Sequence, residues 1–106
     1  MRDGTRSNHV PMPAWFYILR LRSGRLHPGA TTSLAQRWRD HTSGQACRTT
    51  KLDPPTALVF QERFETFSEA RRREAQVKRW SAKKKEALVT GDRDALRTLS
   101  ASHDRA

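Results

Sequence analysis

One carboxylate in the chain stands where helical spacing places apolar side chains. Glu74 falls between Ala70 and Val77 on one helical face. An unpaired buried charge is costly, so this carboxylate is expected to have a compensating partner: a metal ion, an arginine or a hydrogen-bond network. The alternative is a position at the rim of the core, with Glu74 paired to Arg71 or Lys78.

A second candidate pair lies on an earlier predicted helix. Arg37 and His41 are four residues apart, so their side chains are neighbours on one helix surface and both could contact a single phosphate. The alternative is an ordinary solvated arginine beside a partly buried histidine. Spacing alone leaves both interpretations open.

The chain is strongly basic. Its 106 residues include 21 Lys and Arg against 11 Asp and Glu, a formal net charge of +10 at pH 7. This charge favours nucleic acid as the partner, because neutralising backbone phosphates releases condensed counterions; an anionic membrane surface is the weaker candidate. We predict a phosphate-tracking surface that includes Arg71, Arg72, Lys78, Arg79, Lys83 and Lys84.

Hydrophobicity and cysteine content exclude several classes of protein. No apolar run approaches the roughly 20 residues that span a bilayer, and residues 1–13 lack the apolar stretch of a secretory leader. A cytoplasmic protein without a membrane partner is therefore expected. The single cysteine, Cys47, excludes an intramolecular disulfide and zinc sites built from several thiolates, and we interpret it as a small filler.

Three extended segments are predicted. Residues 15–19 are aromatic and branched, and a Ser-Gly pair separates them from a second extended stretch over residues 25–31, which is typical of a β-hairpin. Pro28 donates no ladder hydrogen bond, so the second strand belongs at a sheet edge or at a bulge. A third strand is predicted over residues 57–60, after a polar loop that ends in a Pro-Pro pair.

Capping signals mark the starts of the helices. Ser33 and Gln36 have the spacing of a capping box, in which each side chain bonds to a free backbone N–H of the other. Thr66 and Glu69 repeat this spacing. The predicted helices cover residues 34–42 and 67–80, a third segment opened by Ser81, and a last short one from Asp92 through Leu99.

The order of these elements predicts the fold class. Strand, strand, helix, strand, helix, helix is typical of an α/β (α+β) domain, with a small sheet and helices packed against it. The folded domain is expected to cover residues 14–90. Residues 1–13 are predicted to be a flexible lead, and residues 91–106 a polar helix or tail.

Four short segments follow one another in a specific order. They are F-Y-I-L from Phe16, L-H-P-G-A-T-T from Leu26, S-L-A-Q-R-W-R-D-H ending at His41, and S-E-A-R-R-R-E-A-Q-V-K-R-W ending at Trp80. Together they resemble the GIY-YIG nuclease family, most closely its small single-domain bacterial members of the UPF0213 type. The likeness spans about residues 15–90.

This resemblance implies a three-stranded antiparallel sheet flanked by helices, and an endonuclease that hydrolyses DNA with one divalent metal, Mg²⁺ or Mn²⁺. Carried over position by position, Glu74 matches the carboxylate that holds the metal, and Tyr17 matches the tyrosine implicated in activating the attacking water. Arg37 matches the arginine that stabilises the transition state. Gly29 matches a motif glycine at which a side chain would obstruct close backbone approach.

The chain departs from the family pattern in both named motifs. Trp15 and Phe16 replace the glycine and isoleucine of the first motif, and His27-Pro28 replaces the tyrosine of the second motif and the residue after it. An imidazole accepts a proton near neutral pH more readily than a phenol, so His27 could preserve general-base chemistry or mark a domain kept only for binding. The candidate catalytic residues are Tyr17, His27, Arg37, His41 and Glu74.

Three functions remain open from the sequence: a nuclease, a nucleic-acid-binding module without catalysis, and an RNA-associated or partner-protein adaptor. The leading prediction is a metal-dependent, structure-selective DNA endonuclease of the repair or recombination type, because one compact module offers little surface for reading a long sequence. The alternative is a catalytically weakened module that binds DNA or RNA. DNA is favoured over RNA as the partner.

Overall fold

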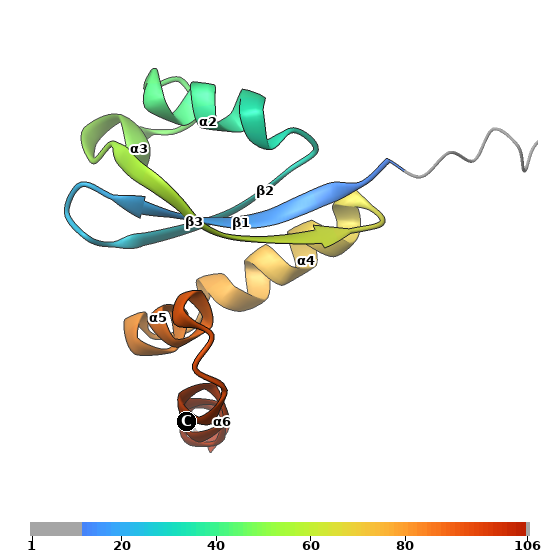
Figure 1. Ribbon diagram of the computed structural model, residues 1–106, viewed down its shortest axis with the longest axis vertical. Coiled ribbons are helices and arrows are strands. Elements are labelled where there is room, and N and C mark those ends of the chain that lie inside the picture. The colour runs from blue at the N-terminus through green and yellow to red at the C-terminus, as the bar shows by residue number, and fades with distance from the viewer. Residues whose placement is uncertain (1–11, 106) are drawn as a thin grey trace, which may run out of the picture.

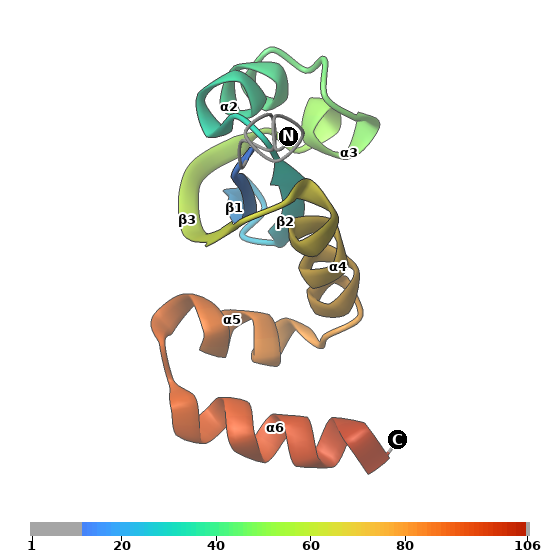
Figure 2. The same ribbon diagram turned by 90° about the vertical axis from the view of Figure 1, so that its right-hand side faces the viewer.

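The structure, a computed structural model, describes residues 12–105 (Figures 1 and 2). It is an α+β fold with a three-stranded antiparallel sheet flanked by helices, as predicted. Of the predicted lead over residues 1–13, all but the last two residues lie outside the described part. The elements are β1 (Ala14–Leu21), β2 (Leu26–Thr31), α2 (Leu34–Thr42), α3 (Arg48–Leu52), β3 (Pro55–Phe64), α4 (Phe67–Lys78), α5 (Ala82–Thr90) and α6 (Arg93–Arg105).

The sheet has the strand order β2-β1-β3, and both strand pairs are antiparallel. In the hairpin register Tyr17 lies opposite Gly29, and Ile18 lies opposite Pro28. β2 is therefore an edge strand, where a residue without a backbone N–H is tolerated. The predicted hairpin and the edge position of Pro28 are confirmed.

The central strand β1 is apolar on both faces because helices cover both. Phe16 and Ile18 pack with Val77 of α4 on one face. Tyr17 and Leu19 belong to a second cluster, which packs against α2 on the other face. Figure 1 shows this layering, with α2 and α3 over one face of the sheet and α4 over the other. Successive side chains of a strand point to opposite faces, so β1 serves both layers with an almost continuous apolar run.

Helix α2 begins and ends where the sequence predicts. The Ser33 hydroxyl accepts a hydrogen bond from the Gln36 backbone N–H at 3.2 Å. The Gln36 side chain does not return to the cap and instead donates to Asp40 at 2.9 Å, so only half of the predicted capping box forms. α2 thus carries Arg37 and His41 on a helix with a defined start.

Helix α4 starts with a complete capping box. The Thr66 hydroxyl accepts from the Glu69 N–H at 3.2 Å, and a Glu69 carboxylate oxygen accepts from the Thr66 N–H at 3.1 Å. α4 ends at Lys78, two residues earlier than predicted, and Ser81 caps α5. The firm start of α4 fixes the register of Glu74 on this helix.

The segment between α2 and β3 differs from the predicted polar loop, because it contains the short helix α3. Cys47 precedes α3 and makes no side-chain capping bond, so the sequence carries no start signal there. Thr50 is the buried residue of this helix. β3 is also longer than predicted, because it pairs with β1 both before and after the apolar residues that mark the strand in the sequence.

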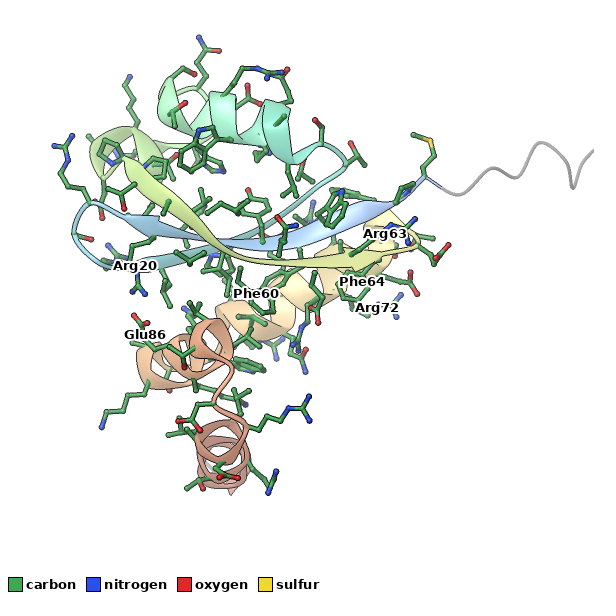
Figure 3. The ribbon with its side chains drawn as sticks, viewed as in Figure 1. Arg20, Phe60, Arg63, Phe64, Arg72 and Glu86 are labelled. Carbon is green, nitrogen blue, oxygen red and sulfur yellow. The ribbon has the colours of Figure 1, made fainter. Side chains whose placement is uncertain are left out.

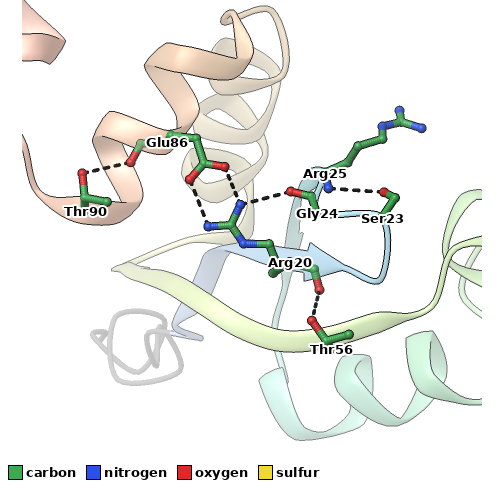
Figure 4. Close-up of polar contacts among 7 residues, drawn as sticks. All are labelled: Arg20, Ser23, Gly24, Arg25, Thr56, Glu86 and Thr90. Atoms are coloured by element: carbon green, nitrogen blue, oxygen red, sulfur yellow. Dashed lines mark hydrogen bonds and ion pairs between the residues drawn. The ribbon is translucent and has the colours of Figure 1, made fainter.

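Helix α5 is joined to the sheet by an ion pair. Arg20 points from β1 toward Glu86, and the two guanidinium nitrogens bond to the two carboxylate oxygens, with Nη2 to Oε1 at 2.9 Å (Figures 3 and 4). Arg20 also donates to the backbone oxygen of Gly24 in the hairpin turn at 3.1 Å. One side chain therefore links β1, the turn and α5.

Helix α6 follows α5 and packs against it. The Asp92 carboxylate accepts from the Ala95 N–H at 3.0 Å, as the predicted cap requires. The helix continues to Arg105, beyond the predicted end at Leu99. Among residues 12–105, no helix is both long and apolar enough to cross a membrane.

Candidate active site

An open pocket of about 540 Å³ is lined by residues of β2, α2, α3 and α4. Figure 2 shows the arrangement of these elements, with α2 and α3 on one side of β2 and α4 on the other. Four elements of the fold contribute the candidate catalytic groups of this pocket. All five predicted residues line it: Tyr17 from β1, His27 from β2, Arg37 and His41 from α2, and Glu74 from α4.

A buried chain of hydrogen bonds starts at Tyr17. Its hydroxyl lies 2.9 Å from Nε2 of His41, and Nδ1 of His41 lies 2.8 Å from the Thr50 hydroxyl. Thr50 in turn donates to the backbone oxygen of Cys47 at 3.4 Å. The two side chains that flank His41 therefore occupy both of its ring nitrogens.

Burial sets the protonation states in this chain. It raises the pKa of Tyr17 to about 12, although the Arg37 charge opposes the rise. It also lowers the pKa of His41 to about 4, helped by His27 and Arg37. At neutral pH both groups are uncharged, so Tyr17 donates to Nε2 of His41, and Nδ1–H of His41 donates to Thr50.

Gly29 provides the space in which the Tyr17 ring lies. A Cβ atom built at position 29 would overlap the Oη and Cζ atoms of Tyr17. This need for glycine is steric, since the residue directly faces Tyr17 in the hairpin register. The close approach implied by the resemblance is thus that of a tyrosine ring to the β2 backbone.

His27 and Arg37 flank the chain of hydrogen bonds. The ring of His27 meets that of His41 edge to face, with centroids 5.3 Å apart. Burial lowers the pKa of His27, and the Lys78 charge lowers it further. Arg37 is half-buried on α2 and lines the pocket. The rings of His27 and His41 thus lie next to each other in the pocket lining.

Glu74 lies in the pocket with 18% of its side chain exposed. Its two carboxylate oxygens are 3.6 Å from Nε of Arg71 and 3.5 Å from Nζ of Lys78. These contacts match the second interpretation, a position at the rim of the core with Glu74 paired to Arg71 and Lys78. The carboxylate faces the pocket and is held there by two cations.

Five arginine and lysine side chains line the pocket, Arg37 among them. Arg71 and Lys78 belong to the predicted phosphate-tracking set, and Arg25 and Lys85 line the same pocket although the prediction did not include them. Burial lowers the pKa of Lys85, and the charges of Arg25 and Lys78 lower it further. The pocket is thus a concave site with an excess of positive charge, which attracts phosphate.

The other predicted basic residues lie outside the pocket lining. Arg72, Arg79 and Lys83 are exposed. Lys84 differs from the expectation of a surface residue: it is 5% exposed, and its ammonium lies 4.0 Å from the centre of the Trp80 ring. Lys84 is thus buried and makes a cation–π contact with Trp80, which lies in the link between α4 and α5.

Two further pocket-lining residues, Cys47 and Phe67, were missed as functional candidates. Cys47 is exposed and lines the pocket, so its interpretation as a filler is wrong. Burial raises the pKa of its thiol, but hydrogen bonds with Thr50 outweigh this effect and leave the pKa lowered. Phe67 is 39% exposed at the pocket and stacks with Arg71 at 5.7 Å. Neither of these residues has a sequence signal of its own, because only folding brings them to β2.

The pocket fits a hard divalent cation at Glu74. Mg²⁺ is commonly held by one or two carboxylates, with waters and a substrate phosphate as the remaining ligands. Glu74 supplies a carboxylate that faces an open pocket, and the surrounding basic groups favour the arrival of a phosphate. Glu74 therefore offers one oxygen ligand of the kind that a divalent cation uses.

Comparison with known proteins identifies the family of this chain. The model of the GIY-YIG catalytic domain matches residues 13–87. A UPF0213 protein of Staphylococcus saprophyticus is 37% identical over 76 residues, which cover 72% of this chain and 93% of the relative. A UPF0213 protein of Listeria monocytogenes is 37% identical over 75 residues, covering 71% and 84%.

A solved structure extends the likeness to the fold. The solution NMR structure of the UPF0213 protein BH0048 from Bacillus halodurans is 36% identical, with a TM-score of 0.50, and the match covers 76% of this chain and 86% of that one. The domain match takes in the strands, α2 and α4, which carry the pocket. This chain belongs to the GIY-YIG nuclease family.

Proposed function

We propose that this chain is a metal-dependent endonuclease that hydrolyses phosphodiester bonds in DNA. The observation that carries the proposal is the convergence of Tyr17, Arg37 and Glu74 on one electropositive pocket, with His41 bonded to Tyr17. Phosphodiester hydrolysis needs a base for the water, a group that stabilises negative charge on the phosphate, and a site for a metal. Each need has a candidate side chain in this pocket.

Arg37 and the basic rim would position the scissile phosphate. A guanidinium presents a planar fork of donors that matches two phosphate oxygens, so Arg37 can follow the charge that develops on the phosphate. Lys78 and Lys85 add point charges to the same pocket lining. These groups offset the repulsion between the phosphate and Glu74.

Tyr17 would accept the proton of the attacking water while it passes its own proton to His41. The 2.9 Å contact with Nε2 of His41 provides the acceptor. A tyrosine with a pKa of about 12 is a weak base as a neutral phenol, so simultaneous transfer to His41 is what makes it effective. His41 thus acts through Tyr17, and Thr50 holds its ring in the required tautomer.

Glu74 would hold one Mg²⁺ or Mn²⁺ ion. Bound there, a divalent cation supplies Lewis-acid stabilisation of the phosphate. Arg71 and Lys78 contact the carboxylate, so they must turn away from it when a cation binds. Both side chains are more than 60% exposed, which leaves them free to move toward the nucleic acid.

The substrate class follows from the size of the domain. A pocket on one small module contacts few nucleotides, so we infer recognition of branched, damaged or single-stranded DNA rather than of a long sequence. DNA in the cytoplasm of a bacterium is the proposed setting, since the relatives described above are bacterial. Structured RNA is the alternative substrate to be tested in the same assay.

The test is cleavage of labelled duplex, single-stranded and branched DNA, and of structured RNA, by the purified chain with Mg²⁺ or Mn²⁺. Replacing Glu74→Gln should lower the cleavage rate by about 10²–10³-fold and leave DNA binding in place. Glu65→Gln is the matched control, because this exposed carboxylate lies outside the pocket lining and pairs with Arg63. Equal cleavage by the wild-type chain and the Glu74 variant would remove the catalytic assignment.

A binding module without catalysis is the second candidate. Two observations favour it: His27-Pro28 departs from the second motif, and Glu74 is engaged by Arg71 and Lys78. Salt-sensitive binding of DNA or RNA, with no cleavage in either metal, is the result that this candidate predicts.

A further inference from the structure

A second group of metal-ligating side chains lies in the same pocket, separate from Glu74. His27 comes from β2, His41 from α2, and Cys47 from the loop that leads into α3. One ligand atom from each of the three residues lies within 4.8 Å of the other two. Three segments that are distant in the sequence thus bring two imidazoles and a thiol close together.

The spacing is close to that of a tetrahedral site. Bonds of about 2.0–2.1 Å from nitrogen and about 2.3 Å from sulfur to zinc place tetrahedral ligands roughly 3.3–3.6 Å apart. With separations of no more than 4.8 Å, each pair of ligand atoms needs to approach by at most about 1.5 Å. Cys47 is exposed and precedes a five-residue helix, so its side chain can make this movement.

The ligand types select the metal. Imidazole and thiolate ligands suit Zn²⁺, whereas Mg²⁺ and Mn²⁺ prefer the carboxylate, phosphate and water oxygens available at Glu74. Three protein ligands leave a fourth position for water or a substrate atom. The geometry points to a Zn²⁺ site formed by His27, His41 and Cys47, whose occupation switches off the nuclease site.

Inhibition follows from the chemistry of the imidazole ring. A neutral imidazole has one nitrogen with a lone pair and one N–H. If zinc takes Nε2 of His41, the metal replaces Tyr17 at that atom. If zinc takes Nδ1, the metal replaces Thr50 and the proton must lie on Nε2, which then cannot accept from Tyr17. Either mode removes the proton acceptor of Tyr17.

The binding arm of the test uses Co²⁺ as a spectroscopic substitute for Zn²⁺ in the full chain. Because the chain has one cysteine, any sulfur-to-cobalt charge-transfer band reports Cys47. We expect one Co²⁺ per chain, displacement by Zn²⁺, loss of the band in Cys47→Ala, and at least about tenfold weaker binding in His27→Gln. Glu74→Gln is the control and should keep the band, since Glu74 belongs to the other site.

The inhibition arm rests on the proposed nuclease function, but the binding arm does not. In the presence of Mg²⁺, Zn²⁺ should suppress cleavage by the wild-type chain and have a much weaker effect on Cys47→Ala. Absence of the band at saturating Co²⁺, one metal per two chains with dimer formation, or a band indifferent to His27→Gln would overturn the site. If no cleavage is seen under any condition, the proposed nuclease function fails. The charge-transfer band still shows whether His27, His41 and Cys47 bind the metal.

Discussion

Gly29 is the residue at which the addition of a single methyl group should disturb the site most. In Gly29→Ala the new methyl group overlaps the Tyr17 ring, so the ring must leave its contact with His41. We expect the free energy of unfolding to fall by about 1–3 kcal/mol, as in other overpacked sites. Denaturant unfolding measures this change, and a loss under about 0.5 kcal/mol would contradict it.

A double-mutant cycle isolates the cause. If the clash with Tyr17 is responsible, Gly29→Ala should cost much less in a Tyr17→Ala background, with an interaction energy of at least about 1 kcal/mol. Additive effects would instead show that Gly29 is required for the β2 backbone itself.

His41 makes the stability of the domain depend on pH. Its pKa is lowered from 6.5 to about 4 in the folded chain, chiefly by burial. Between these two pKa values the unfolded chain binds the proton more readily than the folded chain. The contribution of His41 to the free energy of unfolding is therefore largest above the unfolded pKa and falls as the pH drops from about 6.5 to about 4. His27 acts in the same direction, since its pKa is also lowered.

Denaturant unfolding in chelator at about pH 7 and at about pH 4.5 tests this dependence. A loss on the order of 2 kcal/mol is expected for the wild-type chain, at about 1.4 kcal/mol per pKa unit. His41→Gln keeps a side chain that can donate and accept but does not titrate, so its loss between the two pH values should be smaller. An equally steep loss in this variant would assign the pH dependence to other groups.

At the scale of elements, the Arg20–Glu86 pair determines how α5 is held on the sheet. The side chains are 29% and 44% exposed, so the pair is partly screened by solvent. Glu86→Gln should therefore lower the free energy of unfolding by about 0.5–1 kcal/mol. Asp94→Asn is the control, because Asp94 is 93% exposed in its pair with Arg97 and should have no measurable effect.

The same pair has its own pH window. The hydrogen bond from Arg20 lowers the pKa of Glu86 below its ordinary 4.5. Its stabilising contribution is thus present above pH 4.5 and is lost as the pH falls through the lowered folded value. The difference between wild type and Glu86→Gln should vanish in acid, and a difference that persists there would mean that Glu86 acts through packing.

At the scale of the molecule, the positive charge should make DNA binding strongly salt-dependent. Each phosphate contact contributes about −0.9 to the slope of log Kobs against log salt on duplex DNA. Lys78→Gln and Lys85→Gln should each reduce the slope by about 1, since both residues line the pocket. Arg93→Gln removes the same charge from the exposed start of α6 and should leave the slope unchanged. Fluorescence anisotropy over a salt series measures all three, and equal effects would show that only the net charge matters.

Much of the fold could be predicted because its signals are local. The hairpin, the edge position of Pro28 and the capped starts of α2, α4 and α5 depend on residues a few positions apart. α3 could not be predicted, because it has no capping side chain and five residues are too few for a hydrophobic period. The length of β3 depends on its partner strand rather than on its own apolar residues.

Local sequence patterns were enough to identify the groups available for chemistry. The ordered motifs marked Tyr17, Arg37 and Glu74, and helical spacing placed Arg37 beside His41. The partners of these groups depend on how the elements pack: the bond from Tyr17 to His41, the support from Thr50, and the position of Cys47 near two histidines. These contacts join residues of different elements, and their protonation states depend on burial. Neither property is encoded in local spacing, because both arise only when the strands and helices pack together.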